Sequence, residues 1–253
     1  MTGGTGSLGS VLVERLLKEG VKEVRVFSRD EFKQSVMARK ITDKRVTYWI
    51  GDIRNLERLK EACARVDIII HTAAMKRLDT ISQNVYEVAD ININGTRNVV
   101  LVGKNCEKII FISSDKAYLP TCAYGATKMV AEKIVLVQPN GIVWRFGNFI
   151  GSRGSVWEIF KEQSDLILKN ISGVLTLTDP DATRFVMEIE EVCDYILSDV
   201  GHGLHYPKNL KSMSVLQIAK SINPYAEYKV IGLFEGEKKH EAFDESYSSD
   251  KCL

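Results

Sequence analysis

The chain has 253 residues, of which 45% are hydrophobic and 26% charged, as in ordinary globular proteins. This length suits one or two domains with a sizeable core, and it excludes a disordered chain or a disulfide-stapled mini-protein. Lys and Arg total 34 against 33 Asp and Glu, without the charge runs typical of nucleic-acid binding. No apolar run nears the ~20 residues of a membrane span and no secretory signal is recognised. We therefore expect a cytoplasmic protein without membrane or nucleic-acid partners.

Short apolar runs alternate with amphipathic stretches through the first half of the chain. Strands are predicted at residues 24–27, 47–50, 67–70, 108–112 and 142–145. Helices are predicted at residues 8–19, 56–65, 86–105 and 124–135. Such alternation indicates βαβ units and a parallel sheet. Beyond residue 151, an amphipathic stretch at 156–169 and a Thr-rich segment at 174–178 indicate a smaller lobe, and a helix at 189–197 is expected to return to the sheet.

These elements predict an α/β fold, a Rossmann-like doubly wound parallel sheet with a small C-terminal substrate-binding lobe. Residues 1–150 would form the dinucleotide-binding domain and residues 151–253 mostly the lobe, with 186–200 returning to the first domain. A strand normally precedes the glycine loop of such a fold, at the centre of the sheet. Only Met1 precedes it here, so we expect the first strand to be missing or truncated, or its place to be taken by another segment.

The cysteines and histidines give little sign of a metal or disulfide framework. The five cysteines are scattered and form no C-x-x-C pair, which is typical of reduced thiols in a cytoplasmic protein. His202 and His205 are three residues apart in a segment, 201–205, that is predicted to be a loop. With no cluster of Cys or carboxylates beside them, no metal site is expected.

The nucleotide-binding signal lies at the start of the chain. Residues 3–9, GGTGSLG, place three glycines as G-x-x-G-x-x-G and open a predicted helix. Such a loop gives a tight turn, a bare backbone facing a pyrophosphate, and free N–H groups at the positive end of the helix. A glycine loop alone is weak evidence, but inside a βαβ unit it predicts a dinucleotide site. The predicted contacts here are Gly3, Thr5, Gly6, Ser7 and Leu8.

The choice of dinucleotide depends on the end of the next strand. An NAD site usually offers Asp or Glu to the ribose 2′-hydroxyl there, whereas an NADP site offers Arg. Ser28 and Arg29 stand at this position with Lys33 nearby, and these three favour a 2′-phosphate. Asp30 points to NAD. We expect NADP, with NAD as the alternative.

Candidate catalytic residues follow the strand at 108–112. Asp115 and Lys116 come directly after its Ser-Ser end, and ligands in open α/β sheets bind beyond the carboxyl ends of strands. Tyr124 and Lys128 are four residues apart, so they share one face of a predicted helix. A cationic lysine beside a tyrosine favours the tyrosinate, which would lower the pKa of Tyr124 and make it a usable base.

Together these motifs resemble the extended short-chain dehydrogenases/reductases, and among them the C5-inverting UDP-N-acetylglucosamine 4,6-dehydratases of bacterial flagellin and capsule polysaccharide biosynthesis. The matching stretches are TGGTGSLG at 2–9, SRDEFKQS at 28–35, GDIRNLERL at 51–59, HTAAMK at 71–76, NINGTRNV at 92–99, SSDKA at 113–117, YGATK at 124–128, RFGNFIGSRGSV at 145–156, TRF at 183–185 and GEKKHE at 236–241. They cover nearly the whole chain.

The resemblance implies a lyase reaction on a nucleotide sugar. C4 is oxidised with hydride passing to the bound cofactor, water leaves across C5–C6, and the hydride returns to C6. In this assignment Asp115 is the acid for water loss and Lys116 the base at C5. Tyr124 takes the C4 hydroxyl proton, and Lys128 tunes Tyr124 and holds the nicotinamide ribose. A simple surface ion pair between Asp115 and Lys116 is the alternative interpretation.

The resemblance also implies further contacts and an assembly. Cofactor contacts are expected at Asp52, Ile53, Ala73, Ala74, Lys76, Asn92 and Ser113, besides those at the glycine loop, Ser28, Arg29, Lys33, Tyr124 and Lys128. Contacts to a UDP-sugar are expected at Lys76, Asn148, Ser152, Arg153, Arg184, Glu237 and Glu241. A homodimer or higher homo-oligomer is expected to form through the helices at 86–105 and 124–135.

One departure from the family pattern keeps alternatives open. Phe234 and Glu235 stand where relatives usually carry Arg-Pro, and that arginine helps to clamp the pyrophosphate. A nucleotide-sugar epimerase or reductase of the same fold is one alternative, against which the Asp115–Lys116 pair argues. A catalytically silent nucleotide-binding relative is the other, since fold alone does not decide function.

Overall fold

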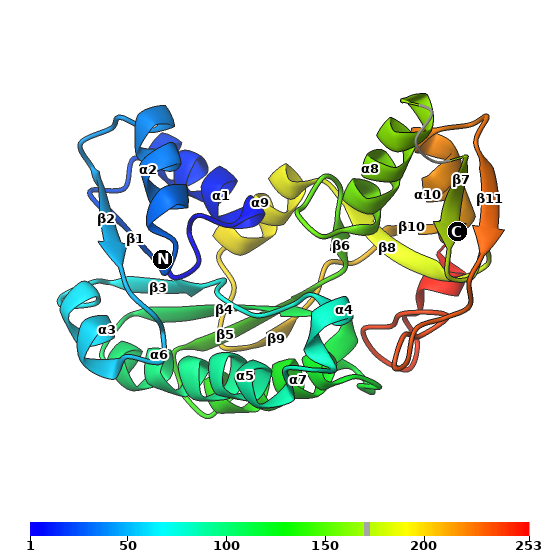
Figure 1. Cartoon of the computed structure of the whole chain (residues 1–253). Coiled ribbons are helices and arrows are strands. Elements are labelled where there is room, and N and C mark those ends of the chain that lie inside the picture. The colour runs from blue at the N-terminus through cyan, green and yellow to red at the C-terminus, as the bar shows by residue number, and fades with distance from the viewer. Residues whose placement is uncertain (170–172, 253) are drawn as a thin grey trace.

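The computed structural model describes residues 1–169 and 173–252, and the residues at 170–172 and 253 of the predicted lobe lie outside them. Figure 1 shows a twisted sheet with helices above and below it, and a separate group of strands and helices beside it. The strands of the main sheet are β1 (Val24–Ser28), β2 (Val46–Ile50), β3 (Ile68–His71), β4 (Lys108–Ser114), β5 (Gly141–Phe146) and β9 (Gly203–His205).

All pairings in the main sheet are parallel. β1 pairs with β2, and β3, β4, β5 and β9 follow one another in that order. Thr2 forms a parallel bridge to Phe27 of β1 and another to His71 of β3, so it joins the two halves. The central position that the sequence analysis left open is therefore occupied by Met1 and Thr2. The predicted α/β fold with a doubly wound parallel sheet is confirmed.

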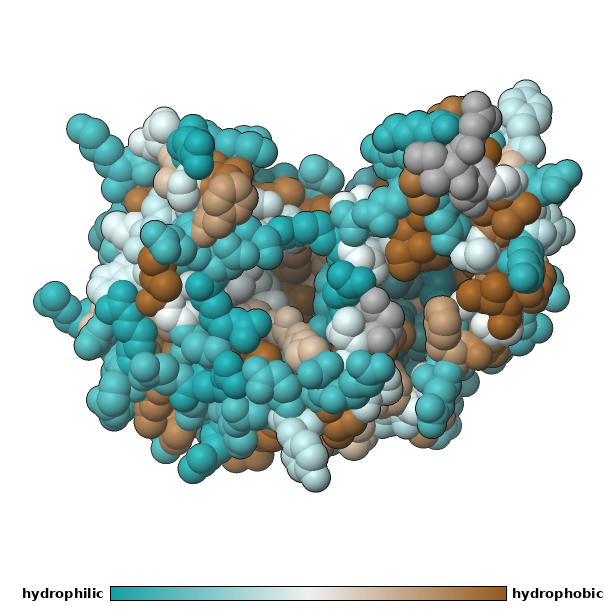
Figure 2. All heavy atoms as spheres, viewed as in Figure 1, coloured by the Kyte–Doolittle hydropathy of each residue, from teal (hydrophilic) through white to brown (hydrophobic). Residues whose placement is uncertain are grey.

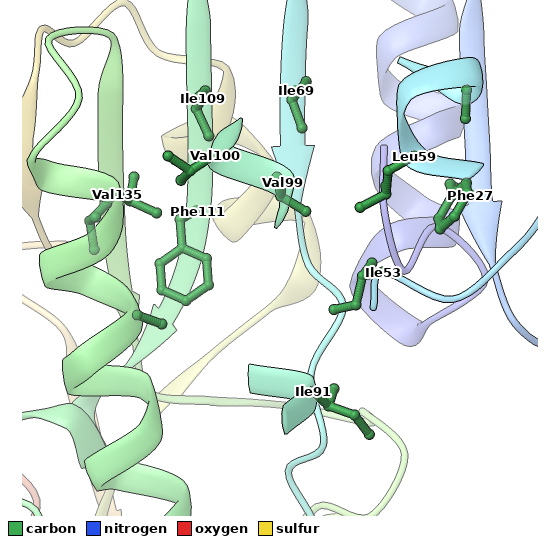
Figure 3. Packing of buried hydrophobic residues seen from close by; sticks show 13 residues of the cluster. Phe27, Ile53, Leu59, Ile69, Ile91, Val99, Val100, Ile109, Phe111 and Val135 are labelled. Carbon is green, nitrogen blue, oxygen red and sulfur yellow. The ribbon is translucent and has the colours of Figure 1, made fainter. Parts of the chain in front are cut away.

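Helices cover both faces of this sheet. On one face lie α3 (Leu56–Ala62), α5 (Val85–Ala89), α6 (Gly95–Gly103) and α7 (Ala123–Leu136), and on the other α1 (Ser7–Lys18), α2 (Glu31–Lys40) and α9 (Ile189–Leu197). The first face has the larger apolar cluster, in which β4 supplies Ile109 and Phe111 and α7 supplies Val135, all at most 1% exposed (Figure 3). This packing holds α7 against β4.

The smaller lobe has its own strands and core. Its strands are β6 (Asn148–Phe149), β8 (Thr183–Met187) and β10 (Lys211–Ser214) in one sheet, and β7 (Val174–Leu177) with β11 (Glu227–Val230) in another. Two helices, α8 (Val156–Leu168) and α10 (Val215–Ile222), pack on Leu175 and Leu177 around a separate apolar cluster. The first strand of this group, β6, begins before residue 150, and the division into two domains at that residue stays a prediction.

Four local predictions need correction. Residues 203–205, predicted as loop, form β9 because their backbone pairs with β5. The sequence analysis missed α2, which begins after Asp30, whose side chain accepts a hydrogen bond from the Lys33 N–H. The helix predicted at 86–105 is broken by a π-helical turn at Asp90–Asn94 and ends at Gly103. The helix predicted at 56–65 ends at Ala62, since Arg65 takes a left-handed conformation (φ 56°).

Candidate functional site

The glycine loop is shaped to approach an anion closely. A Cβ atom at Gly3 would lie 2.7 Å from the backbone nitrogen of Ala73, and one at Gly9 would lie 2.6 Å from the carbonyl oxygen of Gly3. Glycine is therefore required at both positions for the loop to pack this tightly. No side chain caps the amino terminus of α1 at Gly6, so its N–H groups remain for a ligand, and a pyrophosphate suits that end of a helix.

Arg153 crosses from the lobe to this loop. Its guanidinium Nη2 donates to the Thr5 carbonyl over 2.6 Å, and its backbone N–H donates to the Ser7 hydroxyl over 3.0 Å. The sequence analysis placed Arg153 on the sugar nucleotide. The structure places it on the cofactor side of the site, within reach of whatever anion lies at the start of α1.

The predicted ribose end of the site is lined by paired charges. Arg29 lies 3.4 Å from Asp52, and Lys33 lies 2.9 Å from Asp30. Arg29 is 56% exposed, so its pairing is weak and it remains available to a phosphate. Asp30, which in the sequence pointed to NAD, caps α2 and pairs with Lys33. These contacts give Asp30 a structural role that is compatible with an NADP site.

A cleft of about 1140 Å³ runs from this end to the lobe, and the surface is hollowed between the two parts in Figure 2. That volume exceeds what one drug-sized ligand fills, so it suits a dinucleotide and a sugar nucleotide together. The predicted residues that line the cleft are Gly3, Thr5, Gly6, Ser7, Leu8, Ser28, Arg29, Lys33, Asp52, Ile53, Ala73, Ala74, Lys76, Ser113, Asp115, Lys116, Tyr124, Lys128, Asn148, Ser152, Arg153, Arg184, Glu237 and Glu241.

Asn92 is the exception among the predicted cofactor residues. It is 2% exposed within the π-helical turn, where its amide accepts from the Met75 N–H and donates to the Met75 carbonyl and to Thr127. Its polar atoms form hydrogen bonds inside the protein, and Asn92 does not line the cleft. Asn92 instead fixes the backbone beside Ala73 and Ala74, so its expected contact with the cofactor is corrected to a supporting one.

The centre of the cleft holds an acid–base cluster at the end of β4. The Lys116 ammonium lies 3.3 Å from Asp115 Oδ1 and 3.1 Å from Glu241 Oε1. Asp115 is 1% exposed, and its Oδ2 atom has no hydrogen-bond partner among the described residues. A buried carboxyl with a free oxygen at the edge of a ligand cleft is suited to carry a proton to a substrate.

The charges in this cluster shift each pKa. Burial raises the pKa of Asp115, an effect that the nearby Lys116 opposes and the Glu241 carboxylate reinforces. Burial by itself would lower the pKa of Lys116, but the charges of Asp115 and Glu241 outweigh it and the pKa is raised. Lys116 is therefore an ammonium near neutral pH. The pair differs from an exposed loop ion pair, since Lys116 is 17% and Asp115 1% exposed, and the catalytic roles of the two residues stay predictions.

Tyr124 differs from its prediction. Burial raises its pKa to about 12, and the cation that most opposes this shift is Lys116, not Lys128. The Lys128 ammonium donates to the Ile112 carbonyl and lies 3.9 Å from the centre of the Phe111 ring, and burial lowers its pKa to about 7. The expected tuning of Tyr124 by Lys128 is thus absent, because the lysine turns toward the strand.

The two serines at the end of β4 have different hydrogen-bond partners. Ser113 donates to Glu132 of α7 over 2.5 Å, whereas Ser114 donates to Asp115 over 2.8 Å. Successive residues of a strand point to opposite faces, and the sequence alone did not say which serine faces the acid. The predicted cofactor contact at Ser113 stays a prediction, and Ser114 is a site residue that the sequence analysis missed.

The lobe side of the cleft has a second buried ion pair. Arg184 donates to Glu237 over 2.6 Å and also to the carbonyls of Thr183 and Lys239. Phe234, which takes the position of the family's arginine, lines the same part of the cleft and is 60% exposed. The guanidinium of Arg184 is therefore held by groups of the lobe itself, and its expected contact with a UDP-sugar stays a prediction.

Two features tested by the sequence analysis are absent from the described residues. No group of three or more His, Cys, Asp or Glu side chains there is arranged to hold a metal ion. Within residues 1–169 and 173–252, no helix has the length and apolar character needed to cross a membrane.

Comparisons with known proteins agree with this geometry. The inverting UDP-N-acetylglucosamine 4,6-dehydratase of Campylobacter jejuni is 36% identical over 95% of this chain and 75% of its own length. A UDP-glucose 4-epimerase of Rickettsia conorii is 33% identical over 100% of this chain and 79% of its own. The structure of Pen from Bacillus thuringiensis matches with a TM-score of 0.88 at 32% identity, over 96% of this chain and 79% of that one.

More distant structures share the fold. DesIV from Streptomyces venezuelae, a dTDP-glucose 4,6-dehydratase crystallised with NAD, matches with a TM-score of 0.85 at 18% identity, over 96% of this chain and 87% of that one. A family model described as a polysaccharide biosynthesis protein matches residues 1–252. This chain therefore belongs to the polysaccharide biosynthesis protein family of Rossmann-fold, short-chain dehydrogenase/reductase-like proteins.

Proposed function

We propose that the protein is a nucleotide-sugar 4,6-dehydratase that converts UDP-N-acetylglucosamine to a UDP-4-keto-6-deoxy-N-acetylhexosamine with inversion at C5. The observation that carries this proposal is the buried Asp115–Lys116 pair beside Tyr124, in one cleft with a glycine loop. Elimination of water needs both a base at C5 and an acid at the C6 hydroxyl, and this pair supplies both. The name of the Campylobacter relative supports the same substrate.

The first step needs a proton acceptor at the C4 hydroxyl, and Tyr124 has that role. Burial raises the pKa of its phenol, and the Lys116 ammonium and the nearby Ser114 side chain both oppose that rise. A dinucleotide held by the glycine loop would supply the hydride acceptor for oxidation at C4 and the hydride donor for reduction at C6. Lys128 is placed by α7 on the same side of the cleft and is proposed to hold the nicotinamide ribose.

The elimination step follows from the proton that Asp115 and Lys116 share. Their resting form is an ion pair 3.3 Å long, and transfer of one proton gives a neutral amine and a carboxylic acid. The amine then removes the C5 proton, which the C4 ketone has made acidic, and the acid protonates the departing C6 hydroxyl. Loss of water regenerates the ion pair, so the cluster returns to its starting charge.

Incubation with UDP-N-acetylglucosamine tests the proposal. Mass spectrometry is expected to show a product lighter by one water, with a 4-keto group that borohydride reduces. The Rickettsia relative's name favours a second candidate, a 4-epimerase, which would give a product of unchanged mass. No change in the sugar with the cofactor bound would indicate a silent nucleotide-binding protein.

The cofactor is proposed to be NADP rather than NAD. Ser28, Arg29 and Lys33 lie together at the expected 2′ position of the cleft. Replacing Arg29 with alanine removes a charge-assisted hydrogen bond of about 1.5–3 kcal/mol, so NADPH is expected to bind about ten- to a hundredfold more weakly. Fluorescence titration of NADPH and NADH on both proteins measures this. Equal affinity of the unmodified protein for the two cofactors contradicts the proposal.

We also propose a cytoplasmic homo-oligomer that pairs through α5, α6 and α7. Tyr86 is 94% exposed, and Leu101 and Val130 are 37% and 38% exposed on the neighbouring helices. Burying such a face against a second copy in a two-fold contact removes apolar area from water. Light scattering at micromolar concentration is expected to give at least twice the chain mass of 28.4 kDa; a monomer would refute this assembly.

A further inference from the structure

The C-terminal segment after β11 reaches the acid–base cluster from a distant part of the chain. Glu241 is 1% exposed, with Oε1 3.1 Å from the Lys116 ammonium and Oε2 3.1 Å from the Lys238 ammonium. Each carboxylate oxygen thus lies at ion-pair distance from a lysine, and Oε2 has no hydrogen-bond partner among the described residues. Glu241 was predicted to contact the UDP-sugar. In the structure its carboxylate faces the two lysines instead.

The protein fixes Glu241 in this position from several sides. Its backbone N–H donates to the Ser249 hydroxyl over 3.0 Å, and its carbonyl accepts from the Ser249 N–H over 2.8 Å. Lys238 donates to the Tyr118 carbonyl over 2.7 Å, which ties it to the turn that follows Lys116. The carboxylate is therefore a built-in part of the site and not a mobile surface group.

The charges explain what such a carboxylate does. A buried negative charge favours the protonated form of any neighbour, and Glu241 raises the pKa of both Asp115 and Lys116. Burial by itself would raise the pKa of Glu241, but Lys116 and then Lys238 lower it, which keeps Glu241 ionised. The positive charge of Lys238 also offsets part of the field that Glu241 exerts on the cluster. Glu241 therefore raises the pH at which the Asp115–Lys116 pair gains or loses a proton, and Lys238 lowers it.

We propose that Glu241 and Lys238 are positioning residues that hold Lys116 against Asp115 and set the pH range in which this pair carries its single shared proton. This inference rests on the proposed dehydratase function for its catalytic meaning. Only the one-proton state of the pair contains both an amine and a carboxylic acid, so the pH range of that state is the pH range of elimination. The other ionisable groups facing the cluster are Tyr124 of α7, Arg184 of β8 with its partner Glu237, and Lys76 after β3.

The pH dependence of kcat/KM for loss of water tests the proposal. Replacing Glu241 with glutamine is expected to move both limbs of the profile to lower pH by about one unit or more. Replacing Lys238 with glutamine is expected to move both limbs to higher pH. Lys239→Gln is the matched control, because this neighbouring side chain pairs with Asp179 outside the cluster, and its profile is expected to coincide with that of the unmodified protein.

A second measurement does not depend on any substrate. Only a neutral amine reacts with acetic anhydride, so competitive labelling across a pH series reports the protonation of Lys116, read by mass spectrometry of its peptide. The midpoint is expected to fall in Glu241→Gln and to rise in Lys238→Gln. If the midpoints shift but no water is lost from the sugar, the dehydratase proposal fails and the assignment of Glu241 stands. Unchanged midpoints in two folded variants, or shifts of the same sign, overturn it.

Discussion

Replacing Lys116 with alanine is expected to lower the rate of dehydration by about 10²–10⁴-fold, the usual contribution of a positioned acid or base. The reason is that this variant lacks the amine that is paired with Asp115, which is the proposed base at C5. The dinucleotide is expected to bind as before, because its predicted contacts lie along the glycine loop and β1. Turnover in heavy water measures the step directly, since the unmodified protein is expected to place one solvent deuterium at C5.

The Lys116→Arg variant distinguishes the loss of the base from the loss of the buried positive charge. Arginine keeps the positive charge between Asp115 and Glu241, yet it is not deprotonated in proteins. Alanine would instead leave Asp115 without an ion-pair partner and Glu241 with Lys238 alone. We expect this variant to fold with near-normal stability and still to lack deuterium incorporation. Normal incorporation of deuterium at C5 in either variant would show that Lys116 is not the base.

The raised pKa of Lys116 adds a requirement to this mechanism. An ammonium takes no proton, so the lysine must first transfer one to Asp115, whose own pKa is raised by burial. The short distance between them allows that transfer without water. The sequence analysis named the two residues and their roles, but it contained no sign of this coupling, because the coupling depends on burial and on Glu241.

Local patterns predicted much of the fold and the nucleotide end of the site. Strands such as β4 are continuous apolar runs, and the glycine loop opens a helix inside a βαβ unit, where it predicts a dinucleotide site. Asp115 and Lys116 were found because topology places the carboxyl end of a strand at the ligand cleft. Each of these signals lies within a few residues of the feature it predicts.

Long-range contacts explain what the sequence did not reveal. The partner of Lys116 lies 125 positions further along the chain, at Glu241, and the family motif that contains Glu241 gave no reason to connect the two. The π-helical turn around Asn92 likewise depends on hydrogen bonds to Met75 and Thr127, which lie on other segments. The rotation of Lys128 toward Ile112 depends on how α7 packs against β4. The hydrophobic periodicity of the sequence predicts none of these three features.

Replacing Glu132 with alanine is expected to destabilise the protein by about 3–5 kcal/mol, the cost of leaving one partner of a buried ion pair alone. Glu132 of α7 accepts hydrogen bonds from Arg145 of β5 over 2.7 and 2.8 Å and is 1% exposed. Arg145 in turn donates to the Phe243 carbonyl over 3.0 Å. This pair therefore joins α7, the main sheet and the C-terminal segment. Urea unfolding followed by far-UV circular dichroism measures the loss.

The double variant Glu132→Leu with Arg145→Met is the control that identifies the cause. It removes both charges and keeps similar volume, so most of the lost stability is expected to return, because the cost in the alanine variant comes from the unpaired guanidinium and not from a missing attraction. A change below about 1 kcal/mol in Glu132→Ala would show that water or another group solvates Arg145. A large loss that the double variant does not recover would assign the effect to packing of α7. Since α7 also carries Tyr124 and Lys128, the alanine variant is expected to lose activity at least in proportion to its unfolded fraction. Loss of the Glu132 charge also removes an influence that raises the pKa of Lys128 against the effect of burial.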